Sequence, residues 1–160
     1  IKTLFSKYGP VWISSPTTNK LVYHCTIGLN HTFNFLIPKH KIIPSWITRS
    51  KQLYWSFLAG YIDAEGTIRI YAKRARLRIG SYDKTILKQI HNWLIKLKIK
   101  NSFRLESKAD HIKHNGDCYR VDIMDRYALL TCLHKLVPIL HHERRKGDAE
   151  KAWSNVLARI

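Results

Sequence analysis

The chain has 160 residues, of which 45% are hydrophobic, so it is long enough for one domain with a hydrophobic core and too apolar for a disordered polypeptide. It carries 28 Lys and Arg against 11 Asp and Glu, a formal net charge of +17. Because such an excess repels itself in a free protein, we expect a polyanionic partner, nucleic acid above all. The sequence contains neither an apolar run of the roughly 20 residues that span a bilayer nor a long basic amphipathic helix, so we expect no membrane partner.

The three cysteines are Cys25, Cys118 and Cys132, which are odd in number and form no CxxC pair. This usage indicates reduced thiols in an intracellular protein, in the cytoplasm or an organelle matrix. His111, His114 and Cys118 form a possible zinc set, but a fourth ligand is not in register. A solvated loop near DNA is the favoured interpretation.

Residues 1–50 are interpreted as an N-terminal extension that contacts DNA or braces a dimer. Val11 to Ser14 and Leu21 to Ile27 predict a hairpin, followed by a short helix near residues 32–36. A similar order, strand 119–123 and then helical residues 128–130, follows later in the chain. A partial internal repeat and a chance similarity both remain open.

Residues 51–160 predict one domain in the order helix, two strands, helix, two strands, helix, helix. The segment Gln52 to Ala64 is helical in period, and strict alternation predicts strands at Thr67 to Lys73 and, after a basic turn, at Arg76 to Ile79. A helix begins at Lys84 with Asp83 as its cap.

Two further strands and two helices complete this domain. The strands are predicted at Ser102 to Glu106 and Arg120 to Ile123. Asp125 opens a helix through Leu136 that Pro138 ends, and the last helix runs from about Arg144 to the terminus.

Alternation also predicts a basic face on the four strands. Ordinary solvated faces mix charge signs, whereas basic residues recur here on every strand, which favours a sheet that reads DNA over a merely solvated one. Arg suits guanine edges, acids can accept from cytosine, and Lys suits phosphate. The expected members are Thr67, Arg69, Tyr71, Lys73, Arg76, Arg78, Ser102, Arg104, Glu106, Lys108, Arg120 and Asp122, with Ser81 just past the second strand.

The helix that begins near Gln52 combines a stripe of small residues with an acidic end. Ser56, Gly60 and Ala64 lie four apart and therefore share one face, where another backbone can approach closely. Packing within the chain's own core explains small residues equally well. Glu65 follows at the helix end and can project past it, whereas Asp63 is expected to make a structural hydrogen bond or salt bridge. A solvated Glu65 and a Glu65 that binds a divalent cation remain open on these residues alone.

The stretch around these residues is Leu58-Ala59-Gly60-Tyr61-Ile62-Asp63-Ala64-Glu65-Gly66. It closely resembles the signature of the LAGLIDADG homing endonucleases, with Tyr61 in place of a Leu and Glu65 in place of the second Asp. The resemblance covers roughly the last two-thirds of the chain. It implies an α+β fold in αββαββα order with a four-stranded antiparallel DNA-binding sheet, to which residues 1–50 add a hairpin-containing extension.

The same resemblance implies a function and a site. A chain with one motif is expected to be an intron-encoded homodimer whose motif helices pack together through Ser56, Gly60 and Ala64. Such a dimer would cut both strands of a long, roughly palindromic target and leave staggered ends. Glu65 and the Ala64 carbonyl would bind Mg²⁺. If residues 1–50 are the remnant of a first repeat, a first motif would instead lie upstream of Ile1.

Further site residues follow from the family pattern. It places a polar residue at the end of the second strand, here Ser81 with Lys84 close by. It also places a basic residue near the start of the last helix, here Arg144 or Arg145. Two alternatives share this scaffold, namely a maturase-like RNA-binding protein that helps an intron splice and a DNA-binding regulator that does not cleave. An intact Glu65 favours the nuclease.

Overall fold

The computed structural model describes residues 2–14, 24–30, 41–109 and 116–160. The chain divides into two compact units, residues 1–40 and residues 41–160. The first unit contains α1 (Lys2–Phe5) and an antiparallel pair, β1 (Val11–Ile13) with β2 (Cys25–Ile27). These two strands pair as the sequence predicts. The predicted turn between them and the predicted short helix near residues 32–36 lie outside the described residues.

The second unit contains the predicted order of helices and strands. Two short elements, α2 and η2, come in addition to the prediction. Its elements are α2 (Ser45–Thr48), α3 (Lys51–Glu65), β3 (Gly66–Tyr71), β4 (Arg74–Ser81), α4 (Lys84–Lys96), β5 (Ser102–Ser107), β6 (Cys118–Ile123), α5 (Arg126–Leu136), η2 (Val137–Ile139) and α6 (Glu143–Leu157). The four strands form one antiparallel sheet in the order β3-β4-β6-β5. The α+β class and the αββαββα order are therefore confirmed.

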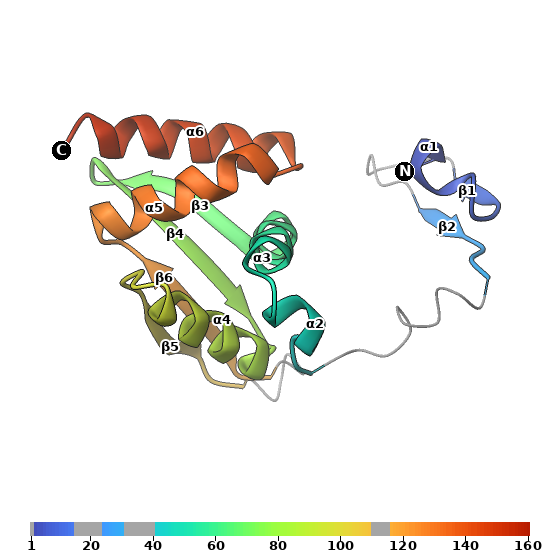
Figure 1. Ribbon diagram of the computed structural model, residues 1–160, viewed down its shortest axis with the longest axis horizontal. Helices are drawn as coiled ribbons and strands as arrows, with labels where there is room; N and C mark the ends of the chain where they lie inside the picture. Colours follow the sequence, from blue (N-terminus) through green and yellow to red (C-terminus); the bar gives the residue numbers. More distant parts are fainter. Residues whose placement is uncertain (1, 15–23, 31–40, 110–115) are drawn as a thin grey trace. The chain divides into compact units, whose positions relative to one another are not determined.

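Helices cover one face of this sheet, and Figure 1 shows α4, α5 and α6 on that side. Alternate strand residues point into the hydrophobic core between the two layers, as period-2 alternation requires. The sheet contributes Ile68, Leu77, Ile79, Val121 and Ile123, all buried. The opposite face of the sheet carries exposed side chains such as Arg69, Tyr71 and Arg74, so much of it is open to a partner.

Local signals set most of the helix boundaries. The Asp125 side chain accepts hydrogen bonds from the backbone N–H groups of Tyr127 and Ala128, as predicted for an N-cap. Asp83 also occupies the N-cap position of α4, but its side chain makes no capping hydrogen bond there, contrary to the expectation. Pro138 converts the end of α5 into the 3-10 turn η2.

Helix α3 passes directly into β3, and the close packing of Gly66 makes this possible. Gly66 is buried, and a Cβ on it would lie 2.6 Å from the Ile62 carbonyl oxygen and 2.7 Å from Ile62 Cγ2. A glycine is therefore required at this position for steric reasons, although its φ of −81° is ordinary. Glu65 is thereby fixed at the boundary between helix and strand.

The end of α3 is also tied to the loop before α6. The backbone N–H of His141 donates a hydrogen bond of 2.9 Å to Asp63 Oδ2. This is the structural hydrogen bond expected of Asp63, and it explains why the two acids of the motif differ. Asp63 connects the end of α3 to the loop before α6, whereas Glu65 is exposed.

We expect Gly66→Ala to lower the free energy of unfolding by about 1–3 kcal/mol, because the added methyl group overpacks the contact with Ile62. Urea denaturation of the full chain measures this change. Gly147→Ala in α6 is the matched control, since a Cβ there meets nothing within 4 Å and Ala favours a helix interior by about 1 kcal/mol. A Gly66→Ala protein as stable as the parent would contradict the packing argument.

Asp63→Ala is expected to lower the free energy of unfolding by about 1 kcal/mol, because the His141 N–H loses its acceptor. Asp63→Asn should recover most of this stability, since an amide oxygen still accepts. Denaturant unfolding of the two variants distinguishes these outcomes. Equal stability losses in both would show that the carboxylate acts through its charge and not through this hydrogen bond.

Candidate functional site

The acidic end of α3 carries the first part of the site. Glu65 is the last residue of the helix and is exposed, as is Ala64 before it. Among residues 2–14, 24–30, 41–109 and 116–160, no group of three or more His, Cys, Asp or Glu side chains could hold a metal ion. Magnesium in nuclease-type sites needs only one or two carboxylates, with waters and substrate phosphates completing the shell. The donors at this helix end fit such a shared site and do not fit an all-protein cage.

Helix α3 also exposes its stripe of small residues. Ser56, Gly60 and Ala64 are all exposed, and a Cβ on Gly60 would meet nothing within 4 Å. The opposite side of the helix buries Tyr54, Leu58 and Ile62. Among the described residues, the stripe therefore does not pack in the chain's own core. Its small side chains would allow another backbone to approach closely.

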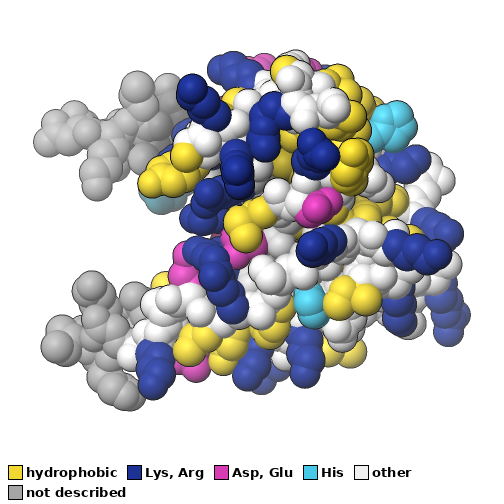
Figure 2. Space-filling view, turned by 90° about the vertical axis from the view of Figure 1, so that its left-hand side faces the viewer, with side chains coloured by type: hydrophobic (Ala, Val, Ile, Leu, Met, Phe, Trp, Pro, Cys, Tyr) yellow, Lys and Arg dark blue, Asp and Glu magenta, His cyan; other side chains and the backbone are white. Residues whose placement is uncertain are grey.

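The exposed face of the four-stranded sheet forms the second part, which we call the basic face. The register places its members opposite one another: Thr67 with Arg78, Arg69 with Arg76, Tyr71 with Arg74, Arg78 with Asp122, Ser102 with Asp122, and Arg104 with Arg120. Between β3 and β4 the face forms a shallow hollow of about 190 Å³ lined by Thr67, Arg69, Tyr71, Arg76 and Arg78. Lys and Arg dominate over Asp and Glu in the space-filling view (Figure 2).

Arg74 belongs to this face and was missed in the sequence. The turn between β3 and β4 contains only Ala72 and Lys73, both with positive φ, as a type I′ turn requires. Lys73 is therefore an exposed turn residue, while Arg74 begins β4 in phase with Arg76 and Arg78. The alternation of Arg76 and Arg78 extends back to Arg74. The sequence interpretation began this strand at Arg76, after a longer turn, and therefore left Arg74 out.

The turn is supported from α6. Asn155 Oδ1 accepts a hydrogen bond from the Ala75 N–H, and Asn155 Nδ2 donates one to the Lys73 carbonyl oxygen. Arg159 donates to the same carbonyl oxygen. Arg76 in turn stacks on the Tyr71 ring, with its guanidinium carbon 5.1 Å from the ring centroid. The tip of the basic face is thus held in place by the end of the last helix.

The expectation that Ser81 joins the basic face is wrong. Ser81 is the last residue of β4 and alternates with Ile79 and Leu77, so it points into the core side and is buried. Its hydroxyl accepts a hydrogen bond from the Asp83 N–H at 3.2 Å. The strand runs two residues further than predicted, which reverses the side that was assumed for Ser81.

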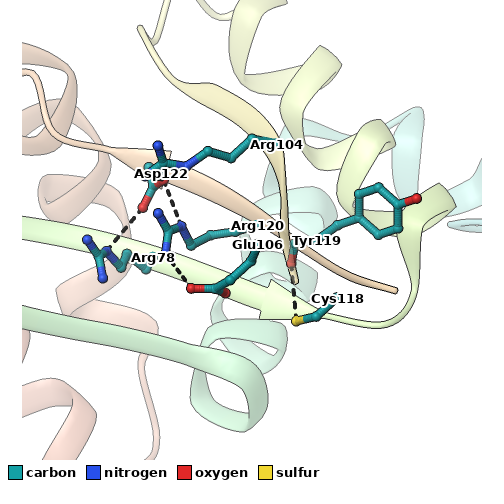
Figure 3. Close-up of polar contacts among 7 residues, drawn as sticks. All are labelled: Arg78, Arg104, Glu106, Cys118, Tyr119, Arg120 and Asp122. Atoms are coloured by element: carbon teal, nitrogen blue, oxygen red, sulfur yellow. Dashed lines mark hydrogen bonds and ion pairs between the residues drawn. The ribbon is translucent and has the colours of Figure 1, made fainter. Parts of the chain in front are cut away.

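The expectation of an exposed Asp122 is also wrong. Asp122 has the correct phase for the basic face, but three arginines cover it, and its side chain is 0% exposed. Arg120 donates through Nε to Asp122 Oδ2 at 2.9 Å, Arg104 Nη2 lies 3.1 Å from the same oxygen, and Arg78 Nε lies 3.2 Å from Oδ1 (Figure 3).

Arg120 makes a second ion pair, with Glu106 (Figure 3). Burial lowers the pKa of the Arg120 guanidinium, but the Asp122 and Glu106 carboxylates outweigh that effect and raise the pKa above its ordinary value. Arg120 therefore stays charged, and its Nε and Nη1 atoms both contact carboxylates. Glu106 lies at an irregularity in the β5–β6 pairing, between Leu105 and Ser107.

The end of α3 and the basic face are close enough to interact electrostatically. Burial raises the pKa of the Cys118 thiol, and the carboxylates of Glu106 and Glu65 raise it further. Burial likewise raises the pKa of the Tyr61 phenol, with contributions from Asp83 and Glu65. The strand register places it independently: Glu65 directly precedes Gly66, which pairs with Ile79 on β4, and Ile79 pairs with Val121 on β6.

The other basic residues expected at the site lie outside the strands. Lys84 is exposed at the start of α4, with Nζ 4.8 Å from the Tyr119 ring centroid. Lys108 is exposed just after β5. In α6, Arg144 is exposed and lies 4.0 Å from Asp148, whereas Arg145 is half-buried. Of the possible zinc set, His111 and His114 lie outside the described residues.

The structure resembles two crystal structures of the homing endonuclease I-CvuI, one in complex with its target in the presence of Ca and one in complex with the I-CreI target in the presence of Mg, with the DNA not cleaved. Each comparison has 20% sequence identity and a TM-score of 0.45, and covers 66% of this chain and 67% of the other. A search of the curated proteins finds no match.

In the described part of the chain, every helix is too short or too polar to cross a membrane. The family model described as the LAGLIDADG-like domain matches residues 52–136, from the first turn of α3 to the end of α5. This match covers more than half of the sequence, and the chain therefore belongs to the LAGLIDADG-like family.

Proposed function

We propose that this protein is a site-specific DNA endonuclease that hydrolyses both strands of a duplex. The observation that carries the proposal is the exposed carboxylate of Glu65, which ends α3 directly before β3, the first strand of the basic sheet. A module that only binds nucleic acid has no need of a carboxylate directed at phosphates, since like charges repel. The net charge of +17 supports a polyanionic substrate.

The proposed enzyme is a homodimer. One chain supplies one Glu65, while cutting two strands requires two such groups. The exposed stripe of Ser56, Gly60 and Ala64 lies on the helix that ends in Glu65, so helix pairing through this stripe would bring two carboxylates together. A two-fold symmetric dimer reads a roughly palindromic sequence, which is the kind of target we propose.

In this proposal, Glu65 and the Ala64 carbonyl hold a divalent cation, Mg²⁺ in the first place. When bound, such an ion lowers the pKa of water and stabilises the leaving oxygen. The chain's own residues position the duplex, with Arg69, Arg74 and Arg76 on the strands, Lys84 at the start of α4 and Lys108 just after β5 contacting phosphates or bases. Arg144 or Arg145 at the start of α6 would neutralise the charge that develops on the phosphate.

We propose that the N-terminal extension, of which residues 1–40 form the separate compact unit, is an arm that contacts DNA or braces the dimer. In the described part of this segment, Lys2, Lys7 and Trp12 are exposed. Basic and aromatic side chains of this kind suit phosphates and bases.

Glu65→Gln is expected to bind DNA with the parent's affinity or better, because it removes a negative charge, and to lose cleavage by on the order of 100-fold or more. The measurement uses a plasmid carrying the duplex sequence that the parent enriches from a randomised library. Linear product with Mg²⁺ is quantified for the parent and the variant. Glu150→Gln, an equal change of charge at an exposed residue of α6, should still cut.

Cleavage by Glu65→Gln at the parent's rate would remove Glu65 from the chemistry. Enrichment of single-stranded RNA in place of duplex DNA would support a splicing role on the same scaffold. Sequence-specific binding without any cleavage by the parent would support a regulator.

Gly60→Leu is expected to abolish dimerisation and double-strand cutting, while the chain itself stays folded. The reason is that a side chain at Gly60 meets open space within the chain but blocks close approach of a second helix. Sedimentation velocity measures the mass, and circular dichroism checks the fold. Gly147→Leu on α6 is the matched control, because its Cβ also meets open space. Dimers of unchanged affinity in Gly60→Leu would refute pairing through this stripe.

A further inference from the structure

The centre of the basic face is occupied by a buried acid. Asp122 lies on β6 between its cross-strand neighbours Arg78 on β4 and Ser102 on β5. Its side chain is 0% exposed and is surrounded by the guanidinium groups of Arg78, Arg104 and Arg120. A carboxylate removed from water in this way is tolerated only when cations and hydrogen bonds compensate it, so its geometry is tightly coupled to theirs.

The three arginines are not equivalent. The Arg120 side chain is only 12% exposed, because it is held between Asp122 and Glu106. The side chains of Arg78 and Arg104 are 39% and 52% exposed, and each contacts Asp122 through a single nitrogen atom. A guanidinium group has five N–H donors, so both side chains keep an outward edge for a further acceptor.

Gly80 makes room for this arrangement. It lies opposite Arg120 on the basic face, where any other residue would place a side chain, and its Cβ would lie 3.5 Å from Glu106 Oε2. The Glu106 side chain therefore extends from β5 over β6 into the space above Gly80, and there it pairs with Arg120. Glu106 and Arg120 thus form a support for Asp122, and the Arg120 side chain, 12% exposed, has little surface left for reading DNA.

We infer that Asp122 is a positioning residue that fixes Arg78 and Arg104 as a pair of guanine-reading side chains. This inference rests on the proposed function, since it assumes a duplex on the basic face. An arginine held against a buried carboxylate by an ion pair has fewer orientations for its remaining edge, and this restriction suits the bidentate contact to the O6 and N7 atoms of guanine. A freely rotating arginine would bind any phosphate instead. By orienting Arg78 and Arg104, Asp122 therefore gives these two basic side chains a preference for particular bases.

Charge and geometry predict opposite effects for Asp122→Asn. The substitution raises the formal net charge by one, so electrostatics alone would strengthen binding to every duplex. If Asp122 positions the two arginines, binding to the preferred duplex weakens while binding to other sequences is unchanged or tighter. The ratio of the two affinities is therefore the informative quantity.

The test uses the full chain and a randomised duplex library, with Ca²⁺ in place of Mg²⁺ to avoid cutting. The parent's enriched duplex and a shuffled duplex of the same composition then serve as probes. We expect the affinity ratio of Asp122→Asn to fall on the order of tenfold or more, with guanine preference lost at the affected positions. Glu150→Gln, the same charge change at an exposed residue of α6, should keep the parent's ratio.

Two charge-preserving variants test the same inference if the Asp122→Asn protein does not fold. Arg78→Lys and Arg104→Lys keep the net charge but lose bidentate geometry, so each should relax the preference at a different base position. An unchanged preference in Asp122→Asn or in both lysine variants would overturn the inference while leaving the proposed function intact. A parent protein that enriches no sequence would overturn the proposed function, and the inference with it.

Discussion

The structure depends on the steric constraint at the junction of α3 and β3. Helix α3 can end and the strand can begin without an intervening loop only because Gly66 packs against the Ile62 backbone, where a Cβ would lie 2.6 Å from the carbonyl oxygen. This junction fixes Glu65 beside the sheet, and the Asp63–His141 hydrogen bond fixes the same helix end against the approach to α6. The acidic group therefore has a defined position at the start of the basic sheet.

Charge is distributed on the sheet in a way that offsets its own repulsion. Arginines on adjacent strands would repel one another, and Asp122 and Glu106 neutralise the most crowded of them. Arg69, Arg74 and Arg76 at the far end of the basic face are outside this cluster, where stacking of Arg76 on Tyr71 orders one of them. The face thus combines an ordered centre with a more loosely held basic hairpin, a combination suited to reading some bases while gripping phosphates around them.

Much of the fold could be predicted from the sequence because its signals are local. Alternation identified all four strands of the sheet, and Asp125 and Pro138 marked the limits of α5. The errors concern where strands begin and end, because tertiary contacts decide those limits. The two-residue turn at Ala72–Lys73, which Asn155 supports, placed Arg74 on the basic face, and the longer β4 turned Ser81 inward. The burial of Asp122 could not be predicted either, because it requires knowing that Arg78, Arg104 and Arg120 meet across three strands.

The central claim is that two copies of α3 pair through their small residues and present two Glu65 carboxylates to one duplex. The most direct measurement is the stoichiometry of the protein on its library-selected duplex with Ca²⁺, obtained by native mass spectrometry of the intact complex. The account predicts two chains for each duplex across the range of protein concentrations that gives specific binding. One chain on each duplex, with specific binding retained, would contradict it.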